Sequence, residues 1–246
     1  PLYVSSGSFT VKVTDLNGCS ATSAPVVVTA TPTPAAPTVT TAVSYCQNVA
    51  ATQLSATGAN LKWYTLATGG TALANTPTPT TGAIGTTNYY VSQTTNTCES
   101  TRVLIAVTVN ALPTATITTT TPTTFCAGGN VILTASSGSL YKWMNGAAAI
   151  TGATAQTYTA ATAGSYTVEV TNASTCKATS TATTVTVNAL PTAAITASGS
   201  TTIVSGTSVI LTASTGSSYI WKRGSTSVGT AQSYTATTAG IYTVEV

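Results

Sequence analysis

A repeat of about 78 residues constrains the fold of this chain more than any other feature of its sequence. The three tryptophans, Trp63, Trp143 and Trp221, are 80 and 78 residues apart. The strings VILTAS and NALPTA each occur twice, in both cases at a shift of 78 residues. A unit of this length has the size of a small β domain. The sequence therefore predicts an array of similar small domains.

Within each repeat, apolar and polar residues alternate over short segments. In SFTVKVT, residues 8–14, Phe and Val alternate with Thr and Lys, which is the period of a strand with one buried and one hydrated face. Such segments recur about every 8–12 residues with Gly, Asn or Ser between them, and no segment has the apolar spacing of a helix. The sequence therefore predicts an all-β chain of two-sheet sandwiches.

The repeat divides the chain into five parts, and we expect the chain to be a window of a longer array. The first repeat, residues 1–31, is the C-terminal part of a truncated domain, and residues 32–37 are a proline-rich linker. Residues 38–110 and 111–188, the second and third repeats, are complete domains. The fourth repeat, residues 189–246, lacks its last strand. The short link between the second and third repeats should restrict swivelling, so we expect an extended, semi-rigid rod.

Charge and hydropathy exclude several classes of function. Only 4% of the residues are charged, against about 25% in ordinary soluble proteins, and the net charge is +3. The seven basic residues are dispersed, so we expect no nucleic-acid partner and no polybasic membrane contact. The mean hydropathy is +0.30, yet no apolar run approaches the roughly 18–20 residues of a spanning helix. We therefore expect no transmembrane segment in this window.

The five cysteines follow the repeat: Cys19, Cys46, Cys98, Cys126 and Cys176. Each complete domain holds an early and a late cysteine, so we expect structural disulfides Cys46–Cys98 and Cys126–Cys176, with the partner of Cys19 upstream of residue 1. Each bond would close a loop of about 50 residues and contribute about 4 kcal/mol in the chain-entropy model. Disulfides indicate an oxidising, extracytoplasmic setting, and buried free thiols are the alternative.

The sequence offers no catalytic or metal-binding set of residues. There is no histidine, and the carboxylates, Asp15, Glu99, Glu169 and Glu245, are spread over the repeats. Catalysis by paired carboxylates needs two such groups within about 5–10 Å, and a calcium site needs several oxygen ligands. We therefore expect no enzyme, no metal and no cofactor. The tryptophans are expected in the domain cores, with a carbohydrate-stacking platform as the alternative.

One recurring motif resembles a corner of immunoglobulin-like domains. AGSYTV, residues 163–168, resembles the E–F corner, in which a tyrosine hydroxyl bonds back to the backbone. The resemblance implies this role for Tyr89, Tyr166 and Tyr242, whereas Phe9 departs from it because it has no hydroxyl. The three tryptophans look like the strand-C tryptophan of that fold. The cysteines depart from the antibody pattern, since Cys176 lies ten residues after Tyr166 and not two.

The second repeat, with YCQ, LKWY, NYYVSQT and CES, is similar to the Ig-like repeats of large secreted proteins of Bacteroidota. The third repeat, with FCAGGNVILTAS and AGSYTVEVTNASTC, looks like their common companion. The resemblance covers essentially the whole chain. It implies a secreted or cell-surface protein of the gliding-motility adhesin type, often exported by the type IX system.

Three functions are compatible with these features. The leading expectation is a structural stalk in a large bacterial cell-surface adhesin, whose partners are neighbouring repeats of the same chain. The second is a subunit of a self-assembling extracellular fibre, through lateral or head-to-tail association. The third is a module that binds an unknown surface glycan or protein through loops such as Ser136–Gly138 or Asn172–Thr175.

Overall fold

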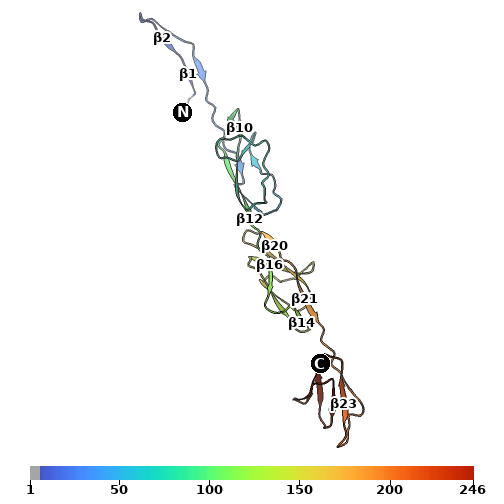
Figure 1. The fold of residues 1–246 in the computed structure, drawn as a ribbon. Coiled ribbons are helices and arrows are strands. Elements are labelled where there is room, and N and C mark those ends of the chain that lie inside the picture. Colours follow the sequence, from blue (N-terminus) through green and yellow to red (C-terminus); the bar gives the residue numbers. More distant parts are fainter. Residues whose placement is uncertain (1–5) are drawn as a thin grey trace. The chain divides into compact units, whose positions relative to one another are not determined.

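The computed structural model describes residues 6–246, in which all regular structure is β-strand (Figure 1). The first five residues of the first repeat lie outside the described residues. No helix in residues 6–246 is long and apolar enough to cross a membrane. The strands therefore agree with the all-β prediction.

The first repeat contributes two small antiparallel ladders. Strand β1 (Gly7–Phe9) pairs with β4 (Val26–Val28), and β2 (Lys12–Thr14) pairs with β3 (Ser20–Thr22). The alternation predicts a buried face here, but Phe9, Val11 and Val13 are all more than half exposed. The reason is that the described residues of this repeat provide no second layer for them to pack against.

The second repeat contains a two-stranded and a four-stranded sheet. The smaller sheet pairs β5 (Thr38–Val39) with β7 (Ala56–Thr57). The larger has the order β6-β12-β9-β8, made of β6 (Ala42–Cys46), β12 (Val103–Asn110), β9 (Gly85–Ser92) and β8 (Lys62–Tyr64). A hairpin of β10 (Thr94–Thr95) and β11 (Cys98–Glu99) separates β9 from β12. The core lies between the sheets and is formed by Leu54, Trp63, Val91, Ile105 and Val107.

The third repeat has the same plan with more strands. One sheet has the order β13-β15-β18, from β13 (Ile117–Thr119), β15 (Val131–Ala135) and β18 (Thr157–Ala160). The other has the order β14-β21-β19-β16-β17, from β14 (Thr124–Cys126), β21 (Thr183–Asn188), β19 (Gly164–Thr171), β16 (Leu140–Asn145) and β17 (Ala148–Ala149). Strand β20 (Lys177–Thr179) pairs with β19. Alternate residues of β15 and β19 are buried, as the period-2 pattern predicts.

The fourth repeat contains two three-stranded sheets. The first has the order β22-β23-β26, from β22 (Ile195–Ala197), β23 (Val209–Ala213) and β26 (Ser233–Ala236). The second has the order β25-β24-β27, from β25 (Thr226–Gly229), β24 (Ile220–Arg223) and β27 (Tyr242–Glu245). β27 is the counterpart of β19, which lies between β21 and β16, whereas β27 is an edge strand among the described residues.

The chain forms two compact units that do not follow the repeat boundaries. The first comprises the chain up to Thr114 together with Ser137–Leu140 and Glu169–Ala178, and the second comprises the remainder. Two segments of the third repeat therefore belong with the second repeat. The segment Glu169–Ala178 contains one of the expected disulfide cysteines, Cys176, which therefore lies in the same compact unit as Cys46.

Candidate functional site

Strand register places Cys46 at the end of the second repeat from which the chain leaves. β6 runs parallel to β12, and its last residue, Cys46, lies opposite Asn110, the last residue of β12. The amide of Gln47 continues this ladder by donating to the Asn110 carbonyl, at 2.9 Å. We call this end of a repeat its C-terminal pole, and the opposite end its N-terminal pole.

The turn after β19 presents Cys176. The Asn172 side-chain oxygen accepts hydrogen bonds from the amides of Ser174 and Cys176, both at 3.0 Å. Thr175 has a positive φ of 64°, which lets the chain reverse immediately before the cysteine. The Cys176 side chain is fully buried. The turn therefore holds the sulfur in one defined position.

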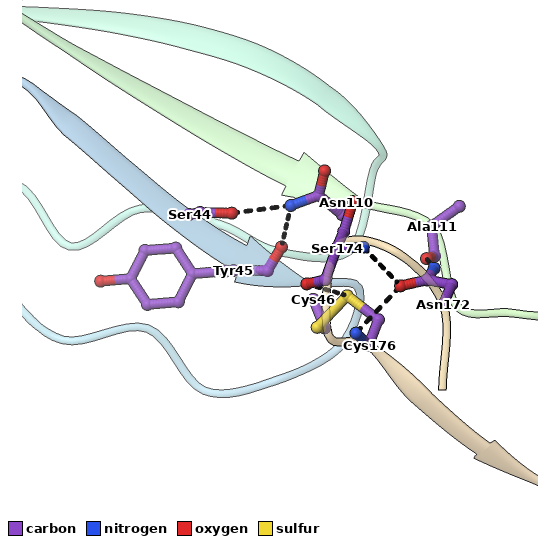
Figure 2. Close-up of a disulfide and its surroundings, with 8 residues drawn as sticks. All are labelled: Ser44, Tyr45, Cys46, Asn110, Ala111, Asn172, Ser174 and Cys176. Atoms are coloured by element: carbon purple, nitrogen blue, oxygen red, sulfur yellow. Dashed lines mark hydrogen bonds between the residues drawn. A yellow bond between two sulfur atoms is a disulfide. The ribbon is translucent and has the colours of Figure 1, made fainter. Parts of the chain in front are cut away.

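A disulfide joins Cys46 to Cys176, two residues separated by 130 positions in the sequence (Figure 2). The Asn172 amide also donates to the Ala111 carbonyl, at 2.9 Å, and so binds the link that leaves β12. On the other side, the Asn110 amide donates to the Ser44 hydroxyl at 2.7 Å and to the Tyr45 carbonyl at 3.3 Å. The C-terminal pole of the second repeat is thus joined to the third repeat by a covalent bond and by hydrogen bonds.

This bond shows that the expected pairings Cys46–Cys98 and Cys126–Cys176 are wrong. Cys98 lies in the β10–β11 hairpin before Val103, where β12 begins, whereas Cys46 lies beside Asn110, where β12 ends. Eight residues of extended strand span about 23 Å, and a disulfide needs Cα atoms within roughly 7 Å. The two cysteines of one repeat are therefore at opposite poles and cannot meet.

The same geometry holds in the third repeat. Cys126 ends β14 and lies opposite Asn188, the last residue of β21, at the C-terminal pole. Cys19, Cys98 and Cys126 are free thiols in the described part of the chain. The sequence prediction assigned the cysteines to the correct repeats but paired the early and the late cysteine of the same repeat, without regard to the pole at which each lies.

The three tryptophans are buried: Trp63 is 4% exposed, and Trp143 and Trp221 are 0% exposed. The indole nitrogens of Trp143 and Trp221 donate to the carbonyls of Ala155 and Ala231, both at 2.9 Å. These positions leave no tryptophan face available for stacking on a sugar. The burial instead assigns the indoles to the domain cores.

Two tyrosines that the sequence analysis did not single out complete these cores. Tyr158 lies between Trp143 and Tyr166, at ring-centroid distances of 5.8 and 5.7 Å. Tyr234 occupies the equivalent place in the fourth repeat, at 6.0 Å from Trp221 and 5.5 Å from Tyr242. The recurring strings QTYTA and QSYTA are the signal that could have identified them.

The tyrosine-corner bond is present in two of the three expected repeats. The hydroxyls of Tyr166 and Tyr242 donate to the carbonyls four residues earlier, Thr162 and Thr238, at 2.9 and 2.8 Å. Tyr89 packs partly buried against its core, but its hydroxyl makes no hydrogen bond within residues 6–246.

The difference at Tyr89 has a local cause. Four residues before Tyr89 stands Gly85, which already pairs with Val109 as part of β9. In the third repeat, β19 begins only at Gly164, so Thr162 lies in the turn before the strand. The backbone at Gly85 is therefore in the ladder and does not fold back over the ring.

A polar cluster on the second repeat surrounds Glu99. One carboxylate oxygen of Glu99 accepts hydrogen bonds from the hydroxyls of Ser92, at 2.5 Å, and Tyr64, at 2.7 Å. The Lys62 ammonium lies 3.5 Å from the other oxygen. These hydrogen bonds, first that of Ser92, lower the pKa of Glu99 although partial burial opposes them. The guanidinium of Arg102 stacks on the Tyr64 ring, 3.2 Å from its centroid, and completes the polar cluster.

Every carboxylate of the chain has a structural partner. Glu99, Glu169 and Glu245 pair with Lys62, Lys177 and Lys222, respectively, and Asp15 accepts hydrogen bonds from the amides of Asn17 and Cys19. Residues 6–246 contain no group of three or more potential metal ligands. The carboxylates therefore stabilise strands and turns of separate repeats, and they do not converge on a common site.

Comparisons with known proteins agree with the architecture. The model of a family described as an Ig-like domain, CHU_C associated, matches residues 34–111. Among solved structures, extracellular domains 3–5 of Drosophila OTK are 12% identical and align over 74% of this chain and 71% of theirs, with a TM-score of 0.35. Murine CEACAM1b is 14% identical over 60% of this chain and 96% of its own, with a TM-score of 0.29. No curated protein matches the chain.

A third structure, the N-terminal four Ig domains of Dscam1 isoform 1.9, is 14% identical, with a TM-score of 0.28. The alignment covers 74% of this chain and only 54% of that structure, so the chain spans about half its length. The sheet order and the family match show that the chain is built of tandem immunoglobulin-like β-sandwich domains. The predicted class of tandem immunoglobulin-like β-sandwich domains is confirmed.

Proposed function

We propose that this chain is a structural stalk of a large extracellular or cell-surface bacterial adhesin. The observation that carries the proposal is the covalent bond between consecutive repeats, Cys46–Cys176. A ligand-binding domain needs no such bond to its neighbour, whereas a load-bearing stalk gains from a second covalent connection beside its main-chain link. Such a bond also requires an oxidising compartment, which supports a location outside the cytoplasm.

The association with gliding motility and export by the type IX system belongs to the same proposal. It rests on the resemblance of the second and third repeats to those of secreted proteins of Bacteroidota. We expect no enzymatic activity, because the carboxylates are engaged in ion pairs and turns of separate repeats. The partners of the stalk are then the neighbouring repeats.

Small-angle X-ray scattering of the oxidised chain tests the stalk. A compact particle of this length has a radius of gyration of about 18 Å. We expect a clearly larger value and a distance distribution with a long tail, because the short links and the disulfide restrict swivelling of the domains. A radius of gyration near that of a compact particle would contradict the proposal.

A self-assembling fibre is the second candidate, and a groove in the fourth repeat favours it. The groove has a volume of about 500 Å³ and is lined by Ile195, Ile203, Leu211 and Tyr242, among others. It lies beside β27, which pairs only with β24 among the described residues, whereas its counterpart β19 also pairs with β21. The occupant that we infer is β4 of a second copy, released from its own β1, because β4 pairs with β1 in the register in which β21 pairs with β19.

This candidate predicts polymers that depend on β4. Size-exclusion chromatography with light scattering should then show concentration-dependent oligomers, which a proline at Val27 abolishes because proline cannot donate to the ladder. A monomer at all concentrations would exclude the fibre and leave the stalk unaffected.

A binding module has less support from the structure. Its candidate loop Asn172–Thr175 already contacts the link after the second repeat, through Asn172 and Ala111, and is followed by the disulfide-bonded Cys176.

A further inference from the structure

Two of the unpaired cysteines occupy the same places in their repeats as the two that are joined. Cys126 lies at the C-terminal pole of the third repeat, as Cys46 does in the second. Cys98 lies in the hairpin at the N-terminal pole of the second repeat, as Cys176 does in the third. We propose that Cys126 and Cys98 are half-sites of further disulfides between repeats, each with a partner cysteine on the adjoining repeat.

The surroundings of Cys126 reproduce those of Cys46. The amide after Cys126, that of Ala127, donates to the Asn188 carbonyl at 2.8 Å, as Gln47 donates to Asn110. The chain then turns through a residue of positive φ, 94° at Gly128 and 63° at Asn48. The links that follow both β12 and β21 read NALPTA. The C-terminal pole of the third repeat thus shares with the pole that carries a bond the strand register, the backbone hydrogen bond, the following turn and the sequence of the link.

The late cysteines are presented by turns with one shared feature. The residue immediately before each of them has a positive φ: 86° at Gly18, 66° at Thr97 and 64° at Thr175. This conformation is uncommon for a threonine, and it recurs where the chain must reverse just before the sulfur. Asp15 caps its turn by accepting from the amide of Cys19, as Asn172 accepts from that of Cys176. In each of the first three repeats, a turn with positive φ therefore comes directly before the late cysteine.

The positions of the partners follow from the repeat. Val246 is the counterpart of Val170, and Cys176 comes six residues after Val170, so the partner of Cys126 belongs six residues beyond Val246. For Cys98 the partner is a cysteine in the opening strands of the preceding repeat, of which β1–β4 are closing strands. Val204 stands at the place of Cys46 and Cys126 in the fourth repeat, so the series of bonds is interrupted after that repeat.

Each bond forms by oxidation of two thiols. Two S–H bonds break, one S–S bond forms, and two protons and two electrons pass to a disulfide oxidant whose own S–S bond is reduced to two thiols. The late cysteine of a repeat is inaccessible to the early cysteine of the same repeat, because the two lie at opposite poles. Pairing therefore selects the neighbouring repeat, and such bonds would form whether or not the array serves as a stalk.

The test adds residues 171–188 of the chain after Val246, which supplies the missing turn and last strand of the fourth repeat. The extended chain is oxidised with glutathione disulfide, alkylated without reduction, and mapped by mass spectrometry. We expect a bond between Cys126 and the added cysteine, so that only Cys19 and Cys98 are alkylated. Four alkylated cysteines, or a bond from the added cysteine to any residue other than Cys126, would overturn the proposal.

Two controls separate pairing from folding. With serine at the added cysteine, Cys19, Cys98 and Cys126 should all be alkylated, as they are free in the original chain. Cys46→Ser should release Cys176 and leave the new bond intact. Rapid hydrogen exchange of the Trp221 amide would show that the extended chain fails to fold. The same mapping is then done on the full-length natural protein. Alkylated Cys126 there refutes the proposal, and Cys126 bonded to the next repeat supports it.

Discussion

The bond between repeats makes a specific prediction about mechanical extension. If the chain is pulled from its ends, the load crosses from Cys46 to Cys176 through the sulfur atoms. The 130 residues of sequence between these positions are then shielded from stretching. Only the segments before Cys46 and after Cys176 can extend fully while the bond is intact.

The magnitude follows from the covalent dimensions of the chain. An extended chain spans about 3.3–3.6 Å per residue, so the shielded part corresponds to about 430–470 Å of contour length. Bonds within each repeat, as the sequence first indicated, would instead shield two separate loops of about 50 residues from extension, each with a contour length of about 170 Å. The two arrangements differ by about 90–100 Å in the total contour length that is shielded, and in whether one or two bonds must be reduced to release it.

Force spectroscopy with optical tweezers measures this difference directly. We expect Cys46→Ser to lengthen the fully extended oxidised chain by about 430–470 Å. Treating the unchanged chain with a thiol reductant should lengthen it by the same amount. Cys98→Ser is the matched control, because Cys98 is a free thiol, and it should change nothing. Equal contour lengths for Cys46→Ser and the unchanged chain would refute the bond between repeats.

Three further predictions concern stability. Cys176→Ser should lower the opening free energy of both the second and the third repeat by about 4 kcal/mol each, because the bond closes a loop of about 65 residues whichever repeat opens. Hydrogen exchange measures this, and an effect confined to the third repeat would contradict it. Tyr166→Phe removes the hydroxyl of a side chain that is 1% exposed, so it should cost about 1 kcal/mol in urea denaturation. Tyr242→Phe, at a less deeply buried ring, is its control and should cost less. Because the pKa of Glu99 is lowered in the folded chain, its stabilising effect is present at neutral pH and is lost as the pH falls below about 4. The difference in Tm between Glu99→Gln and the unchanged chain should therefore shrink from pH 7 to pH 3 in calorimetry, and a constant difference would be the contrary result.

The fold could be predicted from the sequence because its signals are local and repeated. Alternation in segments such as VILTAS fixes which face of a strand is buried, and the spacing of tryptophans sets the length of the domain. The exception is the first repeat, where Phe9 and Val11 alternate correctly but stay exposed. Alternation indicates which face is able to be buried, and burial also requires a second layer.

The disulfide could not be predicted because it depends on strand direction. The pairing of β6 with β12 is parallel, which brings Cys46 to the pole of Asn110. Composition and period are the same for a parallel and an antiparallel first strand, so they do not distinguish the two poles. The role of Asn172 was missed for a related reason. Its contact with Ala111 joins residues 61 positions apart, whereas the sequence signal of an Asx turn is only local.

The fourth repeat indicates that the cysteines serve the junctions and not the domain cores. It has Val204 in place of the early cysteine, yet Trp221 is as buried as Trp143, and the same tryptophan–tyrosine–tyrosine series fills its core. If a disulfide were needed to form the core of a domain, losing a cysteine should loosen that core. The core of the fourth repeat instead forms by apolar burial and the tyrosine corner. The Cys46–Cys176 bond connects two repeats and thereby opposes the opening of each. A stalk needs both properties: domains whose cores form without a disulfide, and bonds between domains that carry load.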